Sequence, residues 1–388
     1  LGIGPIVTAS IVLQLLNGSG IIKFDLTTPE GKKNFQGIQK LLSLGFILFE
    51  SIIYIFMGGL SPTPGNPYYF ELQLLLVFQL ILGGIMIMMM DEVVSKWGFG
   101  SGLSLFIAAG VSKTVFIRTF SPLPSPANPE IMTGAIPSLF QSLAAGDPQT
   151  AILMLGGIIS TIVVFALSVY TQAMKVEIPL SFGRVRGHGI RWPLNFIYTS
   201  NIPVILIAAL LANIQLWGRL LQNWGHPWLG TFGAGGSPLS GLVLWVQPRN
   251  ILDLIINNSF TLPTLWYSLV YVLIMIGGSV LFSIFWVQTS GMDARSQAKQ
   301  MMASGLQVPG FRRDQRILER LLQRYIGPLT VMGAIAVGFL AAIADLGGAL
   351  GNGTGILLTV MIIYKLYEEI AQQHMTDMNP MMRRFMEK

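Results

Sequence analysis

Few side chains in this 388-residue sequence are suited to catalysis or to metal binding. The sequence has no cysteine, and its three histidines, His188, His226 and His374, lie in three separate regions. Disulfides and thiolate zinc sites are therefore excluded, and a shared histidine metal site is not expected. Because no H-E-x-x-H or other enzyme signature occurs, we expect no catalytic residue, no metal and no cofactor.

One ionisable residue, Glu50, lies in the middle of an apolar stretch, between LGFILF and SIIYIF. A carboxylate at membrane depth is costly, so such a residue is a functional candidate by default. It should face the interior of a helix bundle, where Thr8, Asn213 and Gln215 are candidate partners. The alternative is a buried acid that serves packing only, either hydrogen-bonded or kept protonated.

Two glycine-rich strings, GFGSG at 98–102 and GNGTG at 351–355, resemble phosphate-binding loops only superficially. Neither follows a strand, and neither contains the full G-x-x-x-x-G-K-[ST] pattern. Each lies where an apolar helix is expected to begin. We therefore interpret both strings as flexible entries that allow close packing of membrane helices.

The elements that must position these residues are apolar helices. Charged residues make up 11% of the chain and hydrophobic residues 52%, whereas soluble domains are about 25% charged. The period-two alternation of a membrane barrel is absent. Nine apolar segments predict an all-α polytopic membrane bundle. The segments are 1–16, 41–60, 72–90, 102–120, 151–174, 200–218, 264–288, 326–344 and 349–367.

The distribution of positive charge assigns the two sides of the predicted bundle. If nine spans alternate, 20 of the 24 Lys and Arg residues fall on one side, which the positive-inside rule makes cytoplasmic. Two loops on that side, 175–199 and 289–325, are longer and more basic than topology requires. They could dock a phosphate backbone or anionic lipid. The other four residues are Lys113, Arg118, Arg219 and Arg249.

An outer loop at 121–150, rich in proline, serine and glycine, is predicted to be a hinge or linker. It divides the chain into 1–120, with four spans, and 151–388, with five. The chain does not begin with methionine, so we expect that N-terminal residues are missing. One further span at the front would give two equal halves, a plan common in membrane proteins that open around a central site.

The opening segment and five further blocks resemble the SecY/Sec61α family, the central subunit of the protein-conducting channel, and most closely its archaeal branch. The blocks are QKLLSLG at 39–45, DEVVSKWGFGSGLSLFIAAGVSKT at 91–114, SNIPVILIAALLANIQLWG at 200–218, GFRR at 310–313 and GALGNGTGILLTV at 348–360. The resemblance runs the whole length. It implies a ten-span, pseudosymmetric channel of which this chain contains spans two to ten and lacks the first span and the plug. Spans two to five would lie in 1–120, and spans six to ten in 151–388. Residues 1–16, at about 24 Å too short to cross the bilayer, would be the half-helix that follows the plug.

The resemblance, and not composition or spacing, also implies the functional residues. Thr8, Glu50 and Asn213 would form a polar cluster across a lateral gate. Six aliphatic side chains would form a ring at the pore waist: Ile3, Val7, Leu103, Ile107, Ile205 and Leu358. Four arginines in the two basic loops would contact the ribosome: Arg184, Arg186, Arg312 and Arg313.

The implied function is to pass unfolded polypeptides across the plasma membrane and to release transmembrane segments through the lateral gate. The implied partners are SecE/Sec61γ-type and Secβ-type small membrane subunits, the ribosome, a nascent polypeptide with a signal sequence and membrane lipid, but no DNA. The basic loops and the C-terminus would be cytoplasmic. The alternative is a secondary transporter of a small solute, which predicts charged or broken-helix ligands at the midplane. An intramembrane protease would need a paired catalytic group, which we do not find.

Overall fold

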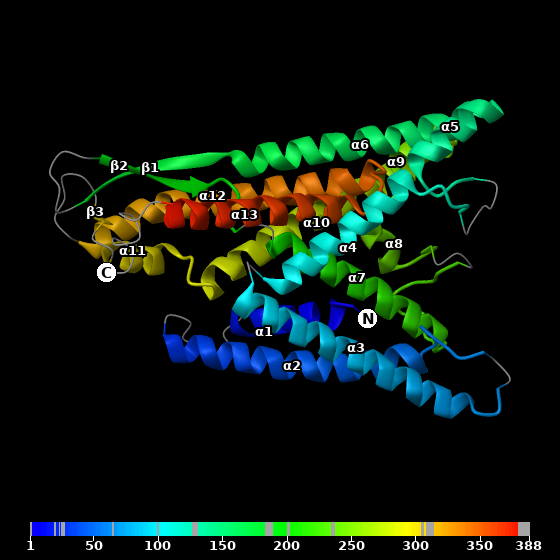
Figure 1. Cartoon of the computed structure of the whole chain (residues 1–388), viewed down its shortest axis with the longest axis horizontal. Helices are drawn as coiled ribbons and strands as arrows, with labels where there is room; N and C mark the ends of the chain where they lie inside the picture. The colour runs from blue at the N-terminus through cyan, green and yellow to red at the C-terminus, as the bar shows by residue number, and fades with distance from the viewer. Residues whose placement is uncertain are drawn as a thin grey trace. The chain divides into compact units, whose positions relative to one another are not determined.

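The computed structural model describes residues 2–18, 21–22, 24, 28–63, 66–98, 101–125, 131–182, 189–199, 202–233, 237–303, 306–307 and 314–378. Helices dominate this part of the chain (Figure 1). They are α1 Gly4–Gly18, α2 Pro29–Phe56, α3 Tyr69–Trp97, α4 Gly102–Phe120, α5 Ala135–Ala145, α6 Pro148–Ala173, α7 Ile202–Asn223, α8 Leu242–Val246, α9 Ile251–Ile256, α10 Leu262–Thr289, α11 Ala294–Ala303, α12 Gln315–Leu346 and α13 Gly353–Met378. The strands are β1 Lys175–Phe182, β2 Gly189–Asn195 and β3 Leu306–Gln307.

Seven helices in the described ranges are long and apolar enough to cross a membrane: α2, α3, α4, α6, α7, α10 and α12. Large apolar side chains cover their outward faces, as Leu74 and Phe78 do on α3, where both are about half exposed. Lipid favours such a surface and water does not, so the predicted helical membrane class is confirmed. Helix α1 is shorter than these seven helices, and the apolar start of α13 is followed by the charged residues Lys365, Glu368 and Glu369. The count of nine spans therefore stays a prediction.

Contacts divide the chain into two compact units that interleave along the sequence. Helices α1, α2, α7, α10 and α12 lie wholly or mostly in unit 1, whereas α4, α6 and α13 lie wholly or mostly in unit 2. Unit 1 contains residues 1–82, 170–249 and 261–343, and unit 2 contains residues 83–169, 250–260 and 344–388.

In unit 1, the short helix α1 contacts α2, α7 and α10 (Figure 1). Its 15 residues rise about 22 Å, which is less than the roughly 30 Å of a hydrocarbon core. Ala9 and Leu13, four residues apart on one face, are completely buried. Enclosure by three longer helices therefore explains how a charge-free helix of this length is held within the bundle.

The loops beside α11 and α12 form a small antiparallel sheet with the strand order β2-β1-β3. Strands β1 and β2 pair in a register that places Lys175 opposite Asn195. Ile178 of β1 is completely buried in a cluster with Leu318 and Leu322 of α12. Figure 1 shows the sheet, α11 and the start of α12 at the same end of unit 1. The sequence predicted only basic loops here. A short strand leaves only a weak alternation of apolar and polar residues, and the many basic residues of these segments indicate loops instead.

Tyr198 fixes the segment between β2 and α7. Its hydroxyl donates to the carbonyl oxygen of Met292, just beyond α10, at 2.6 Å. Burial, together with the nearby Asp293 carboxylate, raises the pKa of Tyr198 to about 12. The phenol therefore stays a neutral donor at physiological pH, and the hydrogen bond ties the start of α7 to the end of α10.

In unit 2, α4 and α13 pack against each other. Val111 and Val115 of α4 lie against the buried side chains of Ile356 and Val360 of α13. A Cβ on Gly355 would lie 3.0 Å from Val111 Cγ2, so the absence of a side chain allows this approach. This contact agrees with the interpretation of GNGTG as a string that permits close helix packing.

Replacing Gly338 by alanine should destabilise the contact between α12 and α10. A Cβ at this position would lie 3.0 Å from the backbone oxygen of Met275 and 2.9 Å from Ser279 Oγ. Because the backbone of α10 cannot move aside as the end of a side chain can, we expect a loss of about 1–3 kcal/mol. The measurement is the midpoint of thermal unfolding in detergent.

Gly277, on the facing helix α10, provides the matched control. No atom from outside its own stretch of helix lies within 4 Å of a Cβ built on Gly277, so Gly277→Ala should be neutral or slightly stabilising. Equal effects of the two substitutions would contradict the close approach assigned to Gly338.

Candidate functional site

The six residues predicted to form the apolar ring divide evenly between the two units. They lie on or beside helices that contact each other within a unit, α1 with α7 and α4 with α13. Val7 and Leu358 are buried, and the other four are partly buried. Ile3, Val7 and Ile205 belong to unit 1, and Leu103, Ile107 and Leu358 belong to unit 2. Their closure into one ring stays a prediction.

The ring candidates at the start of α1 share one helical face. The N–H of Val7 donates to the carbonyl oxygen of Ile3 at 3.1 Å, so one helical turn separates the two side chains. Leu103 and Ile107 have the same spacing on α4. Aliphatic side chains have no hydrogen-bonding atoms, so a surface made from them cannot recognise particular polar groups.

The polar cluster predicted for the gate is assembled inside unit 1 from three helices. Asn213 Nδ2 on α7 donates to Thr8 Oγ1 on α1 at 3.1 Å, and Thr8 Oγ1 donates to the carbonyl oxygen of Gly4 at 3.0 Å. Glu50 of α2 is 8% exposed, and its carboxylate interacts with the Thr8 hydroxyl. Its Oε2 lies 4.0 Å from the place of a Cβ on Gly4. Thr8 therefore links α1 to both neighbouring helices, whereas Gln215 makes no hydrogen bond to the cluster in the described structure.

Replacing Asn213 by alanine should make the separation of α1 from α7 easier. The substitution removes the hydrogen bond to Thr8, which keeps its bond to Gly4. A hydrogen bond between membrane helices contributes about 0.6 kcal/mol, which corresponds to roughly a threefold change in an equilibrium. We expect a marginally apolar test segment to enter lipid about three times more readily, measured by protease protection in reconstituted vesicles.

Gln215→Ala is the matched control, because it removes the same kind of side chain from the same helix. It should leave the inserted fraction unchanged. An equal gain in both variants would assign the effect to the polarity of α7 rather than to the bond with Thr8.

A pocket of about 690 Å³ opens further along, where α2 ends beside α7. Phe56 lines it from α2, and Trp217 and Trp224 line it at the end of α7. Asn223 Nδ2 donates to the carbonyl oxygen of Met57 at 3.2 Å and so joins these two helix ends. This pocket was not predicted from the sequence, although two tryptophans seven residues apart indicate one aromatic helix face.

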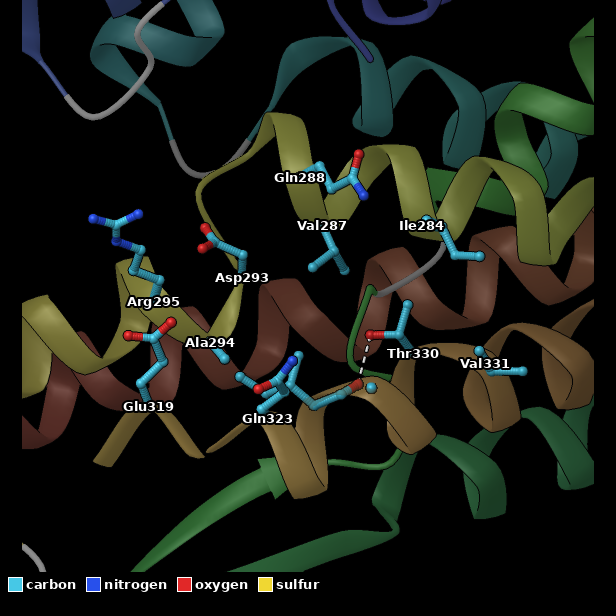
Figure 2. Close-up of a pocket in the computed structure, with 12 residues that line it drawn as sticks. Ile284, Val287, Gln288, Asp293, Ala294, Arg295, Glu319, Gln323, Thr330 and Val331 are labelled. Atoms are coloured by element: carbon cyan, nitrogen blue, oxygen red, sulfur yellow. Dashed lines mark hydrogen bonds between the residues drawn. The ribbon is translucent and has the colours of Figure 1, made fainter. Parts of the chain in front are cut away.

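A second pocket, of about 400 Å³, lies between the end of α10, α11 and the first half of α12 (Figure 2). Ile284 and Val287 line it from α10, and the charged side chains of Asp293, Arg295 and Glu319 gather at its α11 end, as Figure 2 shows. None of its lining residues belongs to the predicted ring or the polar cluster. This pocket is therefore separate from the candidate pore.

The four arginines predicted to contact the ribosome, Arg184, Arg186, Arg312 and Arg313, lie outside the described residues. The elements that flank them are described. Strands β1 and β2 flank 183–188, and β3 and α12 flank 308–313. Because β1 pairs with both β2 and β3, the two basic loops leave from the same small sheet.

These features define a class of protein. Long apolar helices surround a short charge-free helix with a polar seam, and no group of three or more His, Asp or Glu side chains among the described residues is placed to hold a metal ion. The class is a polytopic helical membrane protein. The family model described as SecY matches residues 1–367, and the chain belongs to the SecY family.

Individual relatives agree with this assignment. Protein translocase subunit SecY of Pyrococcus furiosus is 48% identical over 398 residues, which cover 99% of this chain and 83% of the relative. The Methanocaldococcus jannaschii subunit of the same name is 42% identical, with 100% of this chain and 84% of the relative covered. The predicted resemblance to archaeal SecY is therefore confirmed.

Solved structures give the same result for the fold. One described as "The structure of a protein conducting channel" has a TM-score of 0.83 at 43% identity and covers 97% of this chain and 82% of that chain. Another, "Sec61 in the Canine ribosome-channel complex from the endoplasmic reticulum", has a TM-score of 0.80 at 42% identity, with 97% and 81% covered. These are protein-conducting channels and not enzymes, and they give no support to the alternative of a solute transporter.

Proposed function

We propose that this chain is the pore-forming subunit of a Sec translocon, which passes unfolded polypeptides across the membrane and releases transmembrane segments sideways. The observation that carries the proposal is the double role of α1. Ile3 and Val7 at its start are ring candidates, and Thr8, the next residue, is hydrogen-bonded to α7. A movement of α1 away from α7 would therefore change the pore waist and the polar seam together.

The proposed ring acts as a collar around a translocating chain. A narrow aliphatic constriction is poorly wetted and resists the passage of ions. Its side chains make no specific hydrogen bonds, so they part around any sequence that passes. Ile3, Val7 and Ile205 would form half of this collar, and Leu103, Ile107 and Leu358 the other half.

The proposed lateral gate is the seam at which α1 and α2 meet α7 and α10. Thr8, Glu50 and Asn213 would hold this seam by interactions among polar groups that are partly or fully buried, and these groups must separate for the seam to open. An apolar segment in the pore would then contact hydrocarbon. Its transfer into lipid is favourable by itself, so insertion needs no chemistry from the channel.

The partners of the proposed channel follow from the relatives and from the charge pattern. One structural relative is described as part of a ribosome-channel complex, and the arginine-bearing loops of this chain have the charge to dock ribosomal phosphate groups. Arg184, Arg186, Arg312 and Arg313 are the proposed contacts. The family also implies SecE/Sec61γ-type and Secβ-type small membrane subunits. The sequence has no complete phosphate-binding loop motif, so the elongating ribosome would supply the driving force.

The proposed orientation places the channel in the plasma membrane with 175–199, 289–325 and the C-terminus in the cytoplasm. The excess of Lys and Arg on that side supports it. We also propose that 121–150 joins two pseudosymmetric halves, 1–120 and 151–388. This division follows the internal repeat of the family and is distinct from the two units defined by contacts.

Crosslinking a stalled nascent chain tests the proposal. The sequence contains no cysteine, so a cysteine introduced at Ile3 or Ile205 is the only thiol in the chain. Both positions should crosslink to the nascent chain, whereas a cysteine at Phe78, which is 57% exposed on the outside of α3, should not. Equal yields at all three positions, or protection of Ile3 and Ile205 by a small solute instead, would contradict a polypeptide pore.

A further inference from the structure

An aspartate carboxylate reaches the start of α4 and another reaches the start of α13, in the same way. Leu103 N–H, the second residue of α4, donates to Asp91 Oδ1 at 2.6 Å. Thr354 N–H, the second residue of α13, donates to Asp345 Oδ1 at 2.8 Å. Asp91 lies near the end of the preceding helix α3, and Asp345 near the end of the preceding helix α12. We call these two contacts the aspartate clasps.

At α4, the Asp91 clasp replaces an ordinary helix cap. The first N–H groups of a helix have no partner within the helix and are usually satisfied by a Ser, Thr, Asp or Asn side chain at the N-cap. Ser101 occupies the N-cap of α4 but makes no hydrogen bond with its side chain. Asp91 takes this role from 12 residues upstream, and its negative charge is favourable at a helix N-terminus.

The glycine that begins each helix allows the backbone of the clasping aspartate to come close to the helix start. A Cβ on Gly102 would lie 2.7 Å from the Cα of Asp91. A Cβ on Gly353 would lie 2.4 Å from the backbone nitrogen of Asp345. Both distances are shorter than any real contact, so both first positions require glycine. The two glycine-rich strings, which resemble phosphate loops only in sequence, thus lie at helix starts that bind a carboxylate of the chain itself.

The clasps lie within about one helical turn of three ring candidates. Leu103 is itself the residue whose N–H is held by Asp91. Counting from the first residue of each helix, Ile107 is the sixth residue of α4 and Leu358 is the sixth residue of α13. The two clasped helices also pack against each other in unit 2. The same device therefore stands at the same distance from a ring candidate on both helices.

We propose that Asp91 and Asp345 are positioning residues of the pore, which fix the height of Leu103, Ile107 and Leu358 along the channel axis. This inference rests on the proposed pore ring and adds the groups that would fix the positions of its side chains along the channel axis. Loss of a clasp would let the first turn of one helix unwind, and the aliphatic side chain at the sixth position would lose its place in the collar.

A cysteine scan tests the register directly. Single cysteines at positions 105–109 of α4 and 356–360 of α13 are the only thiols in each variant, and a stalled nascent chain carries the crosslinker. In the unaltered channel the yield should peak at 107 and at 358. In Asp91→Ala the peak at 107 should fall about fivefold, as expected for a lost cap, and neighbouring positions should rise, while the α13 scan keeps its maximum at 358. Asp345→Ala should give the reverse.

Asp147→Ala is the matched control. Asp147 caps α6, where Oδ1 accepts the N–H of Gln149 at 3.1 Å and Oδ2 accepts the Thr150 hydroxyl at 2.6 Å. No ring candidate lies on α6. This variant should lower thermal stability and leave both crosslinking maxima in place. If Asp91→Ala fails to accumulate, Asp91→Asn keeps an acceptor oxygen without the charge and should shift the α4 pattern by a smaller amount.

Two kinds of result would overturn the proposal. If the maxima stay at 107 and 358 in the clasp variants, or if all positions of a scan fall by the same factor, the aspartates only stabilise the fold. If no position of either scan crosslinks in the unaltered channel, the assignment of the pore ring fails as well. The first outcome leaves the proposed function intact, so the two failures are distinguishable.

Discussion

Replacing Ile3, Val7 and Ile205 together by asparagine should raise the resting ion conductance of the channel by roughly tenfold or more. The aliphatic ring resists ions because its walls offer water no hydrogen bonds, so a file of water in the constriction is unfavourable. An asparagine amide placed there gives water a hydrogen-bonding partner, so it lowers the free energy of filling the constriction with water. The size of the effect follows from the cost of a polar group left without a partner, about 1–3 kcal/mol. A barrier lowered by only 1.4 kcal/mol already gives about a tenfold gain in rate. Planar-bilayer recordings of the complete channel complex measure the effect.

The matched control keeps the volume and the apolar character of the same three positions. Ile3→Leu and Ile205→Leu, with Val7 kept as it is, should leave the resting conductance near its original value, because volume-conserving apolar swaps are well tolerated. The three positions lie in unit 1, so the variant tests half of the proposed ring. Equal leak in the polar and apolar variants would point to general loosening of α1. Unchanged conductance in the polar variant would reject the ring.

The membrane class and the candidate role of Glu50 could be predicted from the sequence for physical reasons. Charge is so scarce that only lipid could surround these helices, and the break at Asn17 limits α1 to a length that cannot cross a bilayer. Glu50 stood out because an acid within an apolar segment is rare. The structure places it beside Thr8 of the neighbouring helix. Thr8 in turn bonds Asn213, which lies 205 residues further along the chain. The scarcity of deep polar groups limited its candidate partners to Thr8, Asn213 and Gln215, and the family resemblance left Gln215 out of the cluster.

Other features depend on contacts that no local pattern encodes. The clasp of Asp91 on Leu103 spans 12 residues and a helix boundary, and an aspartate near a membrane end reads as an ordinary surface charge. The aromatic pocket at Trp217 required knowledge that α2 ends beside α7. The strand at Ile178 is stabilised by burial against α12, which overrides the weak strand signal of a basic loop. In each case a distant packing partner decides the structure.

Replacing Arg312 and Arg313 together by glutamate should weaken binding to the ribosome by at least about tenfold at physiological salt. Each arginine that neutralises a phosphate releases counterions, so two lost contacts should also reduce the slope of log affinity against log salt by about 1.4–1.8. Reversal of the charge adds repulsion from the ribosomal RNA backbone. Cosedimentation of the reconstituted channel with vacant ribosomes over a salt series measures both quantities.

Arg312→Lys with Arg313→Lys separates docking from membrane topology. Lysine keeps the positive charge that orients the neighbouring spans but lacks the planar fork that binds phosphate in a bidentate manner. We expect an intermediate loss of affinity with an almost unchanged salt slope. The glutamate variant should still insert correctly, because acidic residues contribute little to orientation and 18 of the 20 Lys and Arg residues assigned to the cytoplasmic side remain.

Since both basic loops leave from one sheet, the pair Arg184→Glu with Arg186→Glu should weaken binding by a comparable factor. Unaltered affinity in all of these variants would mean that the loops serve topology alone.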